Sequence, residues 1–224
     1  MSEENTVLDA FRALTTAAVS DALDRLGIDG QAAGIGRVAG GGTVAGRAYT
    51  VRYEPVGVDG GSVGDFIDDV RPGDVVVLAN AGRLTGTIWG GLLSETAARR
   101  GVAATVVDGA CRDVARAREL GYSLYSRTVW MRTGKDRVRA EAIGVPVSIG
   151  GVRVRPGDIV VADDDGTLVV PAGRADAVLA AAREIETTEQ AIRAEVAAGA
   201  RLDEARARHR YHRLQQAVPG AVAP

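Results

Sequence analysis

Cysteine and histidine are scarce in this chain of 224 residues, which has one cysteine, Cys111, and two histidines. A single cysteine cannot form an intrachain disulfide, and we therefore expect a reducing, cytoplasmic setting. No uncharged apolar run approaches the roughly 18 residues that a membrane span requires, and the acidic, polar start of the chain does not look like a signal peptide. These absences predict a cytoplasmic protein that does not cross a membrane.

An excess of charge of either sign is also missing. Lys and Arg number 27 against 29 Asp and Glu, for a formal net charge of −2. The chain therefore lacks the broad basic field that binding to nucleic acid or to an anionic membrane usually needs. We expect a small molecule as partner, bound by one compact domain that is long enough to bury a hydrophobic core.

Two short motifs match well-known signatures but lack the surroundings that these signatures need. Residues 60–64 fit the G-x-S-x-G nucleophile elbow, yet His209 and His212 both lie near the C-terminus and no strand clearly precedes the serine. Residues 34–39 fit a dinucleotide fingerprint, but more glycine follows instead of a helix. A hydrolase triad, a dinucleotide site and a metal site at the two histidines are therefore disfavoured.

What the chain does have is glycine, whose positions and the spacing of apolar residues indicate its elements. The pattern predicts helices over residues 6–26, 89–100 and 112–120, strands over 48–53, 75–79 and 103–107, and a loop over 30–46. Short antiparallel strands are expected over 146–171, and a charged, alanine-rich helix from 175 to at least 196. Arg-Pro-Gly-Asp occurs at 71–74 and again at 155–158, and predicts the same turn into a buried strand at both places.

The order of these elements predicts an α/β fold. Strand, helix and strand over residues 75–107 imply a parallel βαβ unit with a right-handed crossover. We expect an α/β catalytic domain over residues 1–174 and a C-terminal helical extension over 175–224. Because this extension lacks the broad apolar stripe of a helix buried within its own domain, we expect it to pack on a neighbouring subunit.

The segment most informative about chemistry follows the predicted strand 103–107, where Arg112 and Asp113 stand side by side. A glycine-containing loop also leads to a helix start near Leu92 and Leu93, whose free N–H groups can hold a carboxylate. A guanidinium can fork onto carboxylate and keto oxygens, and Asp113 can bind a hard divalent cation. The alternative is that Arg112 and Asp113 only cap the helix that follows.

Motifs along almost the whole chain carry a resemblance to a known family. In chain order they are TAAVSDAL (16–23), AGRAYTV (45–51), WGGLL (89–93), ARRGV (98–102), VVDGACRDV (106–114), VSIGGVRVRPGDIV (147–160) and DDDGTLVVP (163–171). They are similar to the family that includes 4-hydroxy-4-methyl-2-oxoglutarate/4-carboxy-4-hydroxy-2-oxoadipate aldolases and the regulators of ribonuclease E activity. The resemblance implies a swivelling α/β/β fold, assembled as a homotrimer or homohexamer with active sites between subunits.

The resemblance also implies roles for particular residues. In the aldolases a loop and helix start hold the pyruvate carboxylate through backbone amides, and the matching residues here are Gly90, Gly91, Leu92 and Leu93. The arginine that matches Arg112 contacts the pyruvyl oxygens, and the aspartate that matches Asp113 anchors Mg²⁺ or Mn²⁺. A glutamate from the C-terminal helix of a neighbouring subunit completes the water network, and its best match is Glu189.

One position departs from the pattern of the aldolases. Many active aldolases carry an acidic residue directly before the two leucines, where this chain has Gly91. That acid helps to organise the metal–water network, so its absence argues against efficient aldol cleavage. The ribonuclease regulators usually lack the aspartate of the Arg-Asp pair, however, and this chain has it as Asp113. Metal binding is therefore better supported than any one reaction.

The leading hypothesis is a divalent-metal-dependent class II pyruvate aldolase that cleaves a 4-hydroxy-2-oxo acid of the 4-hydroxy-4-methyl-2-oxoglutarate type. Oxaloacetate decarboxylation is a related activity, because both reactions leave the same pyruvate enolate. Lys135, the only lysine, and Arg132 are candidates for substrate selection. The alternative is a non-catalytic trimer that binds a protein such as a ribonuclease; a methyltransferase is disfavoured, because no suitable glycine-rich loop follows a strand.

Overall fold

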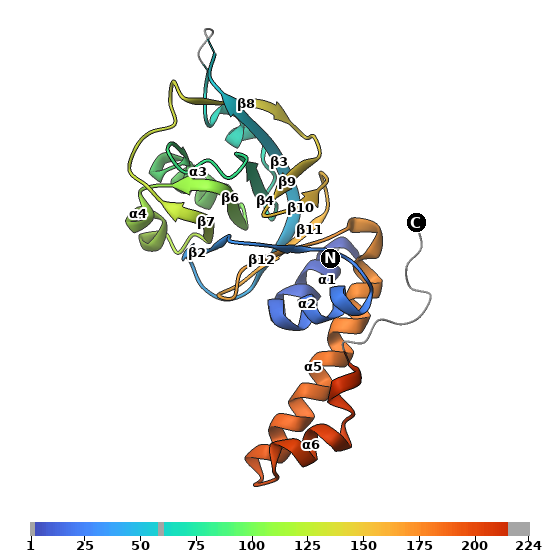
Figure 1. The fold of residues 1–224 in the computed structure, drawn as a ribbon. Helices are drawn as coiled ribbons and strands as arrows, with labels where there is room; N and C mark the ends of the chain where they lie inside the picture. Colours follow the sequence, from blue (N-terminus) through green and yellow to red (C-terminus); the bar gives the residue numbers. More distant parts are fainter. Residues whose placement is uncertain (1–2, 58–60, 215–224) are drawn as a thin grey trace.

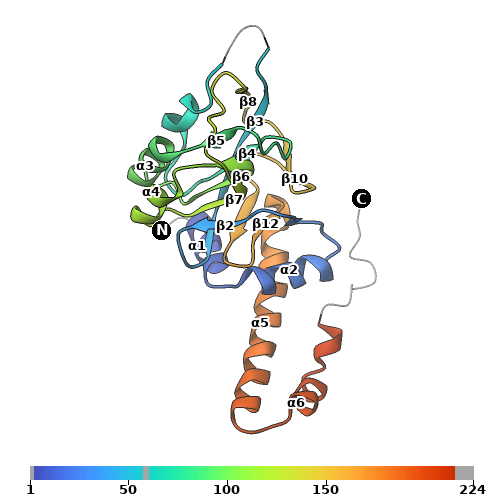
Figure 2. The same ribbon diagram turned by 60° about the vertical axis from the view of Figure 1, so that its left-hand side comes forward.

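The computed structural model describes residues 3–57 and 61–214 and shows a mixed α/β fold around a curled sheet (Figure 1). Helices α3 and α4 lie against one face of the sheet, while α1 and α2 lie beside the start of α5 (Figure 2). The rest of α5 projects away from this body together with α6. The predicted α/β class with a C-terminal helical extension is confirmed.

The helical segments are α1 (Glu3–Arg12), α2 (Thr16–Arg25), η1 (Asp65–Asp69), α3 (Gly91–Arg99), α4 (Val114–Glu119), η2 (Ala172–Arg174), α5 (Ala175–Ala197), α6 (Leu202–Arg208) and η3 (Tyr211–Arg213). The strands are β1 (Gln31–Ala32), β2 (Gly36–Ala39), β3 (Val44–Pro55), β4 (Val75–Ala79), β5 (Thr87–Trp89), β6 (Ala104–Cys111), β7 (Leu124–Val129), β8 (Val138–Ile143), β9 (Val147–Ile149), β10 (Val152–Val154), β11 (Ile159–Ala162) and β12 (Thr167–Val170).

Parallel strands β3, β4, β6 and β7 form the centre of the sheet, with α3 connecting β4 to β6 and α4 connecting β6 to β7. Strands β11 and β12 continue the sheet beyond β3 in antiparallel order, and β9 and β10 form a separate antiparallel hairpin. The predicted parallel βαβ unit and the antiparallel character of residues 146–171 are confirmed. Parallel strands end at one edge of a sheet, so the residues that follow β4 and β6 come together there.

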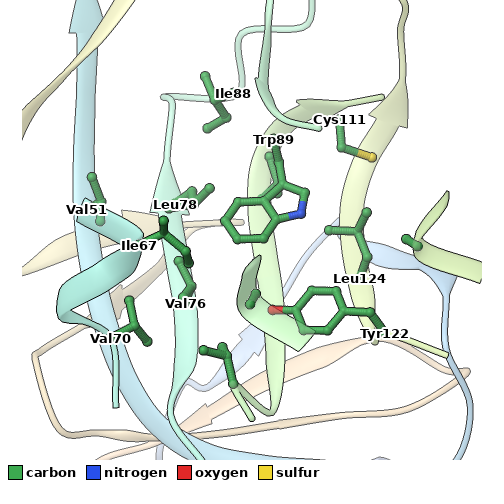
Figure 3. Packing of buried hydrophobic residues seen from close by; sticks show 14 of the residues in the cluster. Val51, Ile67, Val70, Val76, Leu78, Ile88, Trp89, Cys111, Tyr122 and Leu124 are labelled. Carbon is green, nitrogen blue, oxygen red and sulfur yellow. The ribbon is translucent and has the colours of Figure 1, made fainter. Parts of the chain in front are cut away.

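The core on the helix-covered face is centred on Trp89, which is 1% exposed. Figure 3 shows its indole among Leu78, Leu124 and Tyr122, with Cys111 close by. The indole Nε1 donates to Ser94 Oγ at 2.9 Å, and its ring stacks on Tyr122 with centroids 6.3 Å apart. Because Ser94 lies in the first turn of α3, these contacts fix the start of that helix against the sheet.

The single helix predicted over residues 6–26 is wrong, because the chain breaks there into α1 and α2. Thr15 has an extended backbone, with φ −80° and ψ 153°, and its side chain accepts a hydrogen bond from the Ala18 N–H at 3.2 Å. A threonine in this role starts a new helix even where apolar spacing continues unbroken. Both helices still bury apolar residues, among them Phe11 and Leu23.

The loop predicted over residues 30–46 is also wrong, since this region contains β1, β2 and the start of β3. Strand β1 pairs with β12, and β2 pairs with β7. Partners far away in the sequence supply these hydrogen bonds, so local glycine content does not reveal them. Within β3, a Cβ on Gly46 would lie 2.3 Å from the Gly73 carbonyl oxygen, and glycine thus permits a close approach of two backbones.

The two Arg-Pro-Gly-Asp segments form the same turn, as predicted. The aspartate N–H donates to the arginine carbonyl in both, at 3.2 Å from Asp74 to Arg71 and 3.1 Å from Asp158 to Arg155. The glycine of each turn has φ of 85°, a left-handed conformation in which other residues are strained. The strands that follow, β4 and β11, are buried along their whole length.

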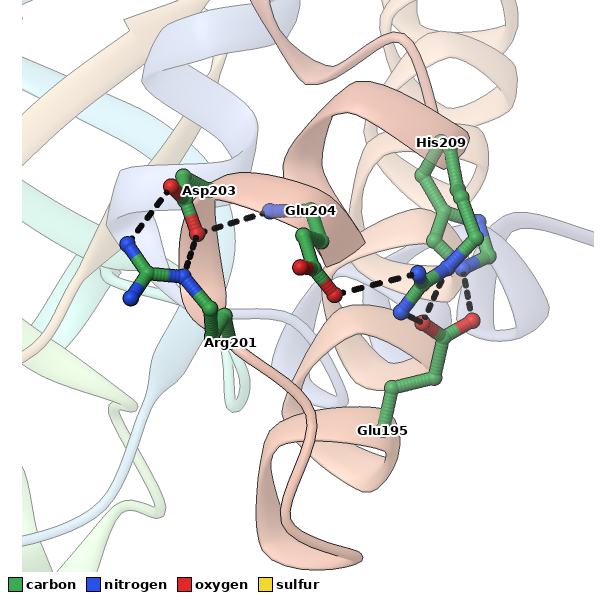
Figure 4. Close-up of polar contacts among 6 residues, drawn as sticks. Glu195, Arg201, Asp203, Glu204 and His209 are labelled. Carbon is green, nitrogen blue, oxygen red and sulfur yellow. Dashed lines mark hydrogen bonds and ion pairs between the residues drawn. The ribbon is translucent and has the colours of Figure 1, made fainter.

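The long helix α5 belongs to the body in its first half and leaves it in its second. Val178, Leu179 and Ile185 are buried with residues of α1 and α2, so the packed core continues past the predicted boundary at residue 174. Farther along, α6 folds back on α5, and Glu195 accepts a hydrogen bond from Arg208 at 2.6 Å and pairs with His209 at 2.7 Å (Figure 4). Of the helices that the structure describes, none combines the length and apolarity needed to cross a bilayer.

Candidate active site

The predicted site residues meet in a cavity of about 170 Å³ where the start of α3 faces the end of β6. Its lining includes Gly90, Gly91, Leu92, Leu93, Arg112 and Asp113, together with Val63, Thr87, Ile88, Trp89 and Thr133. The structure thus brings together all predicted substrate-binding and metal-binding residues. The predicted catalytic residue Glu189 is elsewhere in this protomer.

Asp113 is held in an unusual way. It occupies the position before the first residue of α4, but its side chain makes no capping hydrogen bond to that helix. Instead, Asp113 Oδ2 accepts a hydrogen bond of 2.9 Å from the Gly91 N–H at the start of α3. The backbone of Asp113 is left-handed, with φ of 56°, a conformation that Asp tolerates better than most residues. The alternative that Asp113 merely caps its own helix is therefore wrong.

Arg112 lies beside this carboxylate, with Nε 3.6 Å from Asp113 Oδ2. Its backbone N–H donates to the Trp89 carbonyl at 2.9 Å, which ties the end of β6 to the end of β5. The side chains of Arg112 and Asp113 are 41% and 51% exposed. A guanidinium and a carboxylate are thus anchored by their backbones and open to a ligand.

The start of α3 differs slightly from the prediction. The helix begins at Gly91 rather than at residue 89, because Trp89 belongs to β5. Since the first amides of an α-helix have no partner one turn earlier, the N–H groups of Leu92 and Leu93 are available to an anion. Leu92 is 86% exposed and lines the cavity.

The two glycines of this helix start leave room for the Arg112–Asp113 pair. A Cβ on Gly90 would lie 3.0 Å from Asp113 Oδ2 and 3.4 Å from Arg112 Nε. A Cβ on Gly91 would lie 3.3 Å from Asp113 Cβ. These contacts are tight, so a side chain at position 90 or 91 would fit only if Arg112 and Asp113 shifted slightly.

A chain of ion pairs joins the two helices that carry the site. Glu95 of α3 contacts Arg116 of α4 at 3.1 Å and Arg99 of its own helix at 2.6 Å, and Arg116 also contacts Glu119 at 3.1 Å. The hydrogen bond from Arg116, followed by the charges of Arg116 and Arg99, lowers the pKa of Glu95. Sequence reasoning missed this link, because Glu95 and Arg116 are 21 positions apart and no spacing rule joins them.

Cys111 directly precedes Arg112 but does not fit the role of a nucleophile. It is buried, and its Sγ lies 3.3 Å from Ser126 Oγ. Burial raises the pKa of the Cys111 thiol, whereas a reactive cysteine needs an accessible thiolate. Cysteine chemistry is therefore disfavoured, and the polar groups of the cavity remain the candidates.

Most of the other residues singled out in the sequence do not line this cavity. Glu189 is on α5 and pairs with Arg193 at 2.5 Å on the same helix. Lys135 and Arg132 are exposed on the loop around Thr133, whose backbone is joined to β5 by the hydrogen bond from Thr87 N–H to the Arg132 carbonyl. His209 lies in the helical arm, and part of the segment 60–64 falls outside the described residues.

The donor set suits a hard cation that keeps most of its waters. Across residues 3–57 and 61–214, no three side chains of His, Cys, Asp or Glu gather into a metal cluster. Mg²⁺ and Mn²⁺ need no such cluster, because one or two carboxylates, water and substrate oxygens suffice for an octahedral site. Asp113 offers one half-exposed carboxylate whose second oxygen accepts no hydrogen bond from the described part of the chain. The residues present therefore fit such an ion.

Comparison with known proteins places these features in a family. Residues 16–169 match the RraA-like family, described as Aldolase/RraA. The chain is 39% identical over 194 residues to Protein DlpA of Legionella pneumophila; the match covers 85% of this chain but only 32% of DlpA, so the chain spans about a third of that relative. It is 32% identical over 127 residues to a 4-hydroxy-4-methyl-2-oxoglutarate aldolase of Thermus thermophilus, which covers 57% of this chain and 75% of the relative.

The fold agrees with the sequence match. The crystal structure of Streptomyces coelicolor RraAS2, an unusual member of the RNase ES inhibitor RraA protein family, superposes with a TM-score of 0.77 at 31% identity, covering 85% of this chain and 96% of that one. The protein belongs to the RraA-like family. The resemblance inferred from the sequence motifs is thereby confirmed, and the family contains relatives named as aldolases as well as RNase inhibitors.

Proposed function

We propose that the cavity between α3 and the end of β6 is the active site of a divalent-metal-dependent lyase. Its substrate is a 4-hydroxy-2-oxo acid of the 4-hydroxy-4-methyl-2-oxoglutarate type, and its product is pyruvate. The observation that carries this proposal is the convergence of Arg112, Asp113 and the α3 amides on one cavity. The relative named as an aldolase of this specificity supports it.

The reaction breaks the bond between C3 and C4 of the substrate. A base accepts the proton of the 4-hydroxyl group, and C4 becomes the carbonyl carbon of the departing fragment. The electron pair of the broken bond moves toward the C2 keto oxygen and gives an enolate. C3 then takes a proton to give pyruvate. Oxaloacetate decarboxylation develops the same negative charge after loss of CO₂, which is why we propose it as a second activity of this site.

Arg112 acts on this developing charge. Its backbone is held by the hydrogen bond to the Trp89 carbonyl, and its guanidinium lies beside Asp113 at the cavity, where its positive charge stabilises the oxyanion that forms. The N–H groups of Leu92 and Leu93 bind the substrate carboxylate, because the Gly91 N–H is already used by Asp113. Asp113 would hold Mg²⁺ or Mn²⁺, and such an ion, when bound, withdraws electrons from the keto oxygen.

The site is completed in the assembly by Glu189 of a neighbouring subunit, within a homotrimer or homohexamer. A carboxylate within hydrogen-bond reach of a water can accept its proton and so relay the proton of the 4-hydroxyl group. The second half of α5 supports this part of the proposal, because it projects from the body and carries Glu189 away from its own sheet (Figure 1).

The direct test is a substrate screen with a metal control. Purified protein is mixed with 4-hydroxy-4-methyl-2-oxoglutarate or oxaloacetate, and pyruvate release is measured with Mg²⁺, with Mn²⁺ and with a chelator. We expect release that stops with chelator and returns with added metal. Absence of release from either substrate, together with saturable binding of a ribonuclease, would favour the non-catalytic function of the RNase inhibitors instead.

A further inference from the structure

A second cavity, of about 360 Å³, opens at the same strand ends but on the opposite face of the sheet. The strand register places Arg52 of β3 beside Ala79 of β4, and Ala79 beside Asp108 of β6. Arg127 of β7 completes this row through its ion pair with Asp108. Neighbouring residues in a row across a sheet point to the same face, so these side chains share one surface.

This face is not the one that α3 covers. Val51, Leu78 and Val107 each come one position before a residue of the row and therefore point to the other face, where they pack in the core around Trp89. Val77 and Val106 come two positions before Ala79 and Asp108 and share their face, and these two valines pack with the β9–β10 hairpin. The second cavity is therefore separated from Arg112 and Asp113 by the sheet itself.

Asp108 fixes the position of Arg127. Its side chain is 5% exposed, and its carboxylate accepts hydrogen bonds from Arg127 Nε, from the Gly82 N–H at 3.2 Å and from the Gly150 N–H at 3.4 Å. Burying the Asp108 carboxylate removes its charge from water, and this cost offsets much of what the ion pair contributes to stability. What it does is hold the guanidinium in one direction, which suggests recognition of a ligand.

Both arginines have donors to spare. Within the described residues, Arg127 makes no hydrogen bond except the one from Nε to Asp108, so its two terminal nitrogens are free for a ligand. Arg52 is exposed and has no hydrogen-bond or ion-pair partner in that part of the chain. Ala79 lies between them in the row, and its small side chain leaves the hollow open. Glu54, the other acid of this cavity, is paired with Arg83 at 3.4 Å.

We propose that Arg52 and Arg127 form a binding site for a small organic anion that carries a carboxylate or phosphate group. The forked donors of the two guanidinium groups suit planar or tetrahedral oxyanions, and the buried Asp108 keeps one of the forks in place. This site is distinct from the proposed lyase site and needs no metal. An anion here binds at the end of β6, only a few residues along that strand from Arg112.

The test is calorimetric titration of metal-free protein with malonate and with inorganic phosphate. It is done in the Arg112→Gln background, so that the lyase cavity has lost its arginine. We expect saturable binding of at least one probe, with one site per chain, and the preferred probe distinguishes a carboxylate ligand from a phosphate ligand. Arg52→Gln should weaken binding of the preferred probe about tenfold or more, because charge-assisted hydrogen bonds are lost.

Arg127 needs a gentler change, because its full removal would leave the buried Asp108 charge alone and endanger the fold. Arg127→Lys keeps the charge but loses the fork, and it should also weaken binding about tenfold while the melting temperature stays near that of the parent. Arg118→Gln, which changes an exposed arginine on α4, is the matched control and should bind as the parent does. No saturable binding of either probe, or equal affinities in all these variants, would overturn the proposal.

Discussion

At the scale of single residues, Asp113 is the side chain that we propose to bind the metal ion. Asn tolerates the left-handed backbone at this position, and its side-chain oxygen can still accept the hydrogen bond from Gly91. We therefore predict that Asp113→Asn lowers Mn²⁺ affinity at least tenfold in a calorimetric titration. The free energy of unfolding should fall only by the loss of a charge at a helix start, about 0.3–1 kcal/mol. Unchanged Mn²⁺ affinity in a folded variant would contradict the assignment.

Gly91 is the second residue whose change is informative. Its backbone is helical, so a side chain is allowed there, but its Cβ would press on Asp113 at 3.3 Å. We predict that Gly91→Asp raises pyruvate release severalfold, because it restores the acid that many aldolases have before the two leucines. Gly91→Ala is the control: it adds the same Cβ without the charge, and should give no gain. A folded, metal-binding Gly91→Asp variant with no higher turnover would point to another substrate or to a regulatory protein.

The residues that line the cavity could be predicted from the sequence, but the orientations of their side chains could not. Motifs and strand order were enough to bring Arg112 and Asp113 to the helix start at Leu92. That Asp113 turns away from α4 and binds Gly91 depends on how closely two helices pack, which no local pattern records. The row from Arg52 to Arg127 was missed for a related reason, since it exists only once the register of the parallel strands is known.

At the scale of elements, the ion pair between Glu95 and Arg116 joins α3 to α4. Because Asp113 bridges the same two helices, we predict that Glu95→Gln weakens Mn²⁺ binding about two- to fivefold, the range expected of one exposed ion pair. Glu119→Gln removes the other partner of Arg116 within α4 and should leave Mn²⁺ affinity unchanged. The double variant Glu95→Arg/Arg116→Glu exchanges the two charges and should restore Mn²⁺ binding. Equal losses of Mn²⁺ affinity in Glu95→Gln and in the Glu119→Gln control would count against a positioning role for Glu95.

The same pair gives a pH dependence of known sign. The pKa of Glu95 is lowered in the folded protein, chiefly by its hydrogen bond to Arg116, so its stabilising effect is complete above the ordinary range of a glutamate and disappears as pH falls through the lowered pKa. The melting temperature of the unaltered protein should exceed that of Glu95→Gln at neutral pH. The two should converge in acid. A difference that is constant over the whole range would show that the pair is not responsible.

Some elements follow from local sequence and others do not. Strand β4 has the predicted bounds because turn residues enclose an unbroken apolar run over 75–79. The break between α1 and α2 escaped prediction, because a single cap at Thr15 interrupts a continuous apolar spacing. Strands β1 and β2 escaped it because their hydrogen-bond partners lie in β12 and β7, about 90 to 140 residues further along the chain.

At the scale of the whole molecule, we propose that the active site combines residues from two copies of the chain. We predict that Glu189→Gln keeps the oligomer but lowers turnover, whereas Glu184→Gln, whose side chain pairs with Arg25 of its own chain, leaves turnover unchanged. Mixed oligomers are the sharper test. Chains with Glu189→Gln and chains with Arg112→Gln should regain activity when assembled together, because some sites then have both residues. Mixed oligomers without any such gain would show that Glu189 does not act across subunits.

We propose that Arg112 stabilises the negative charge that develops on the substrate, and the turnover of an Arg112 variant reports on this role. Pyruvate release from 4-hydroxy-4-methyl-2-oxoglutarate or oxaloacetate, whichever the substrate screen identifies, is compared at saturating Mg²⁺ for the unaltered protein, Arg112→Gln and Arg118→Gln. Loss of one group that stabilises a developing oxyanion lowers turnover by a factor of about 100 to 1,000, which is the fall we predict for Arg112→Gln, with Arg118→Gln unaffected. A folded Arg112→Gln variant that releases pyruvate at the unaltered rate would show that Arg112 does not act on this charge.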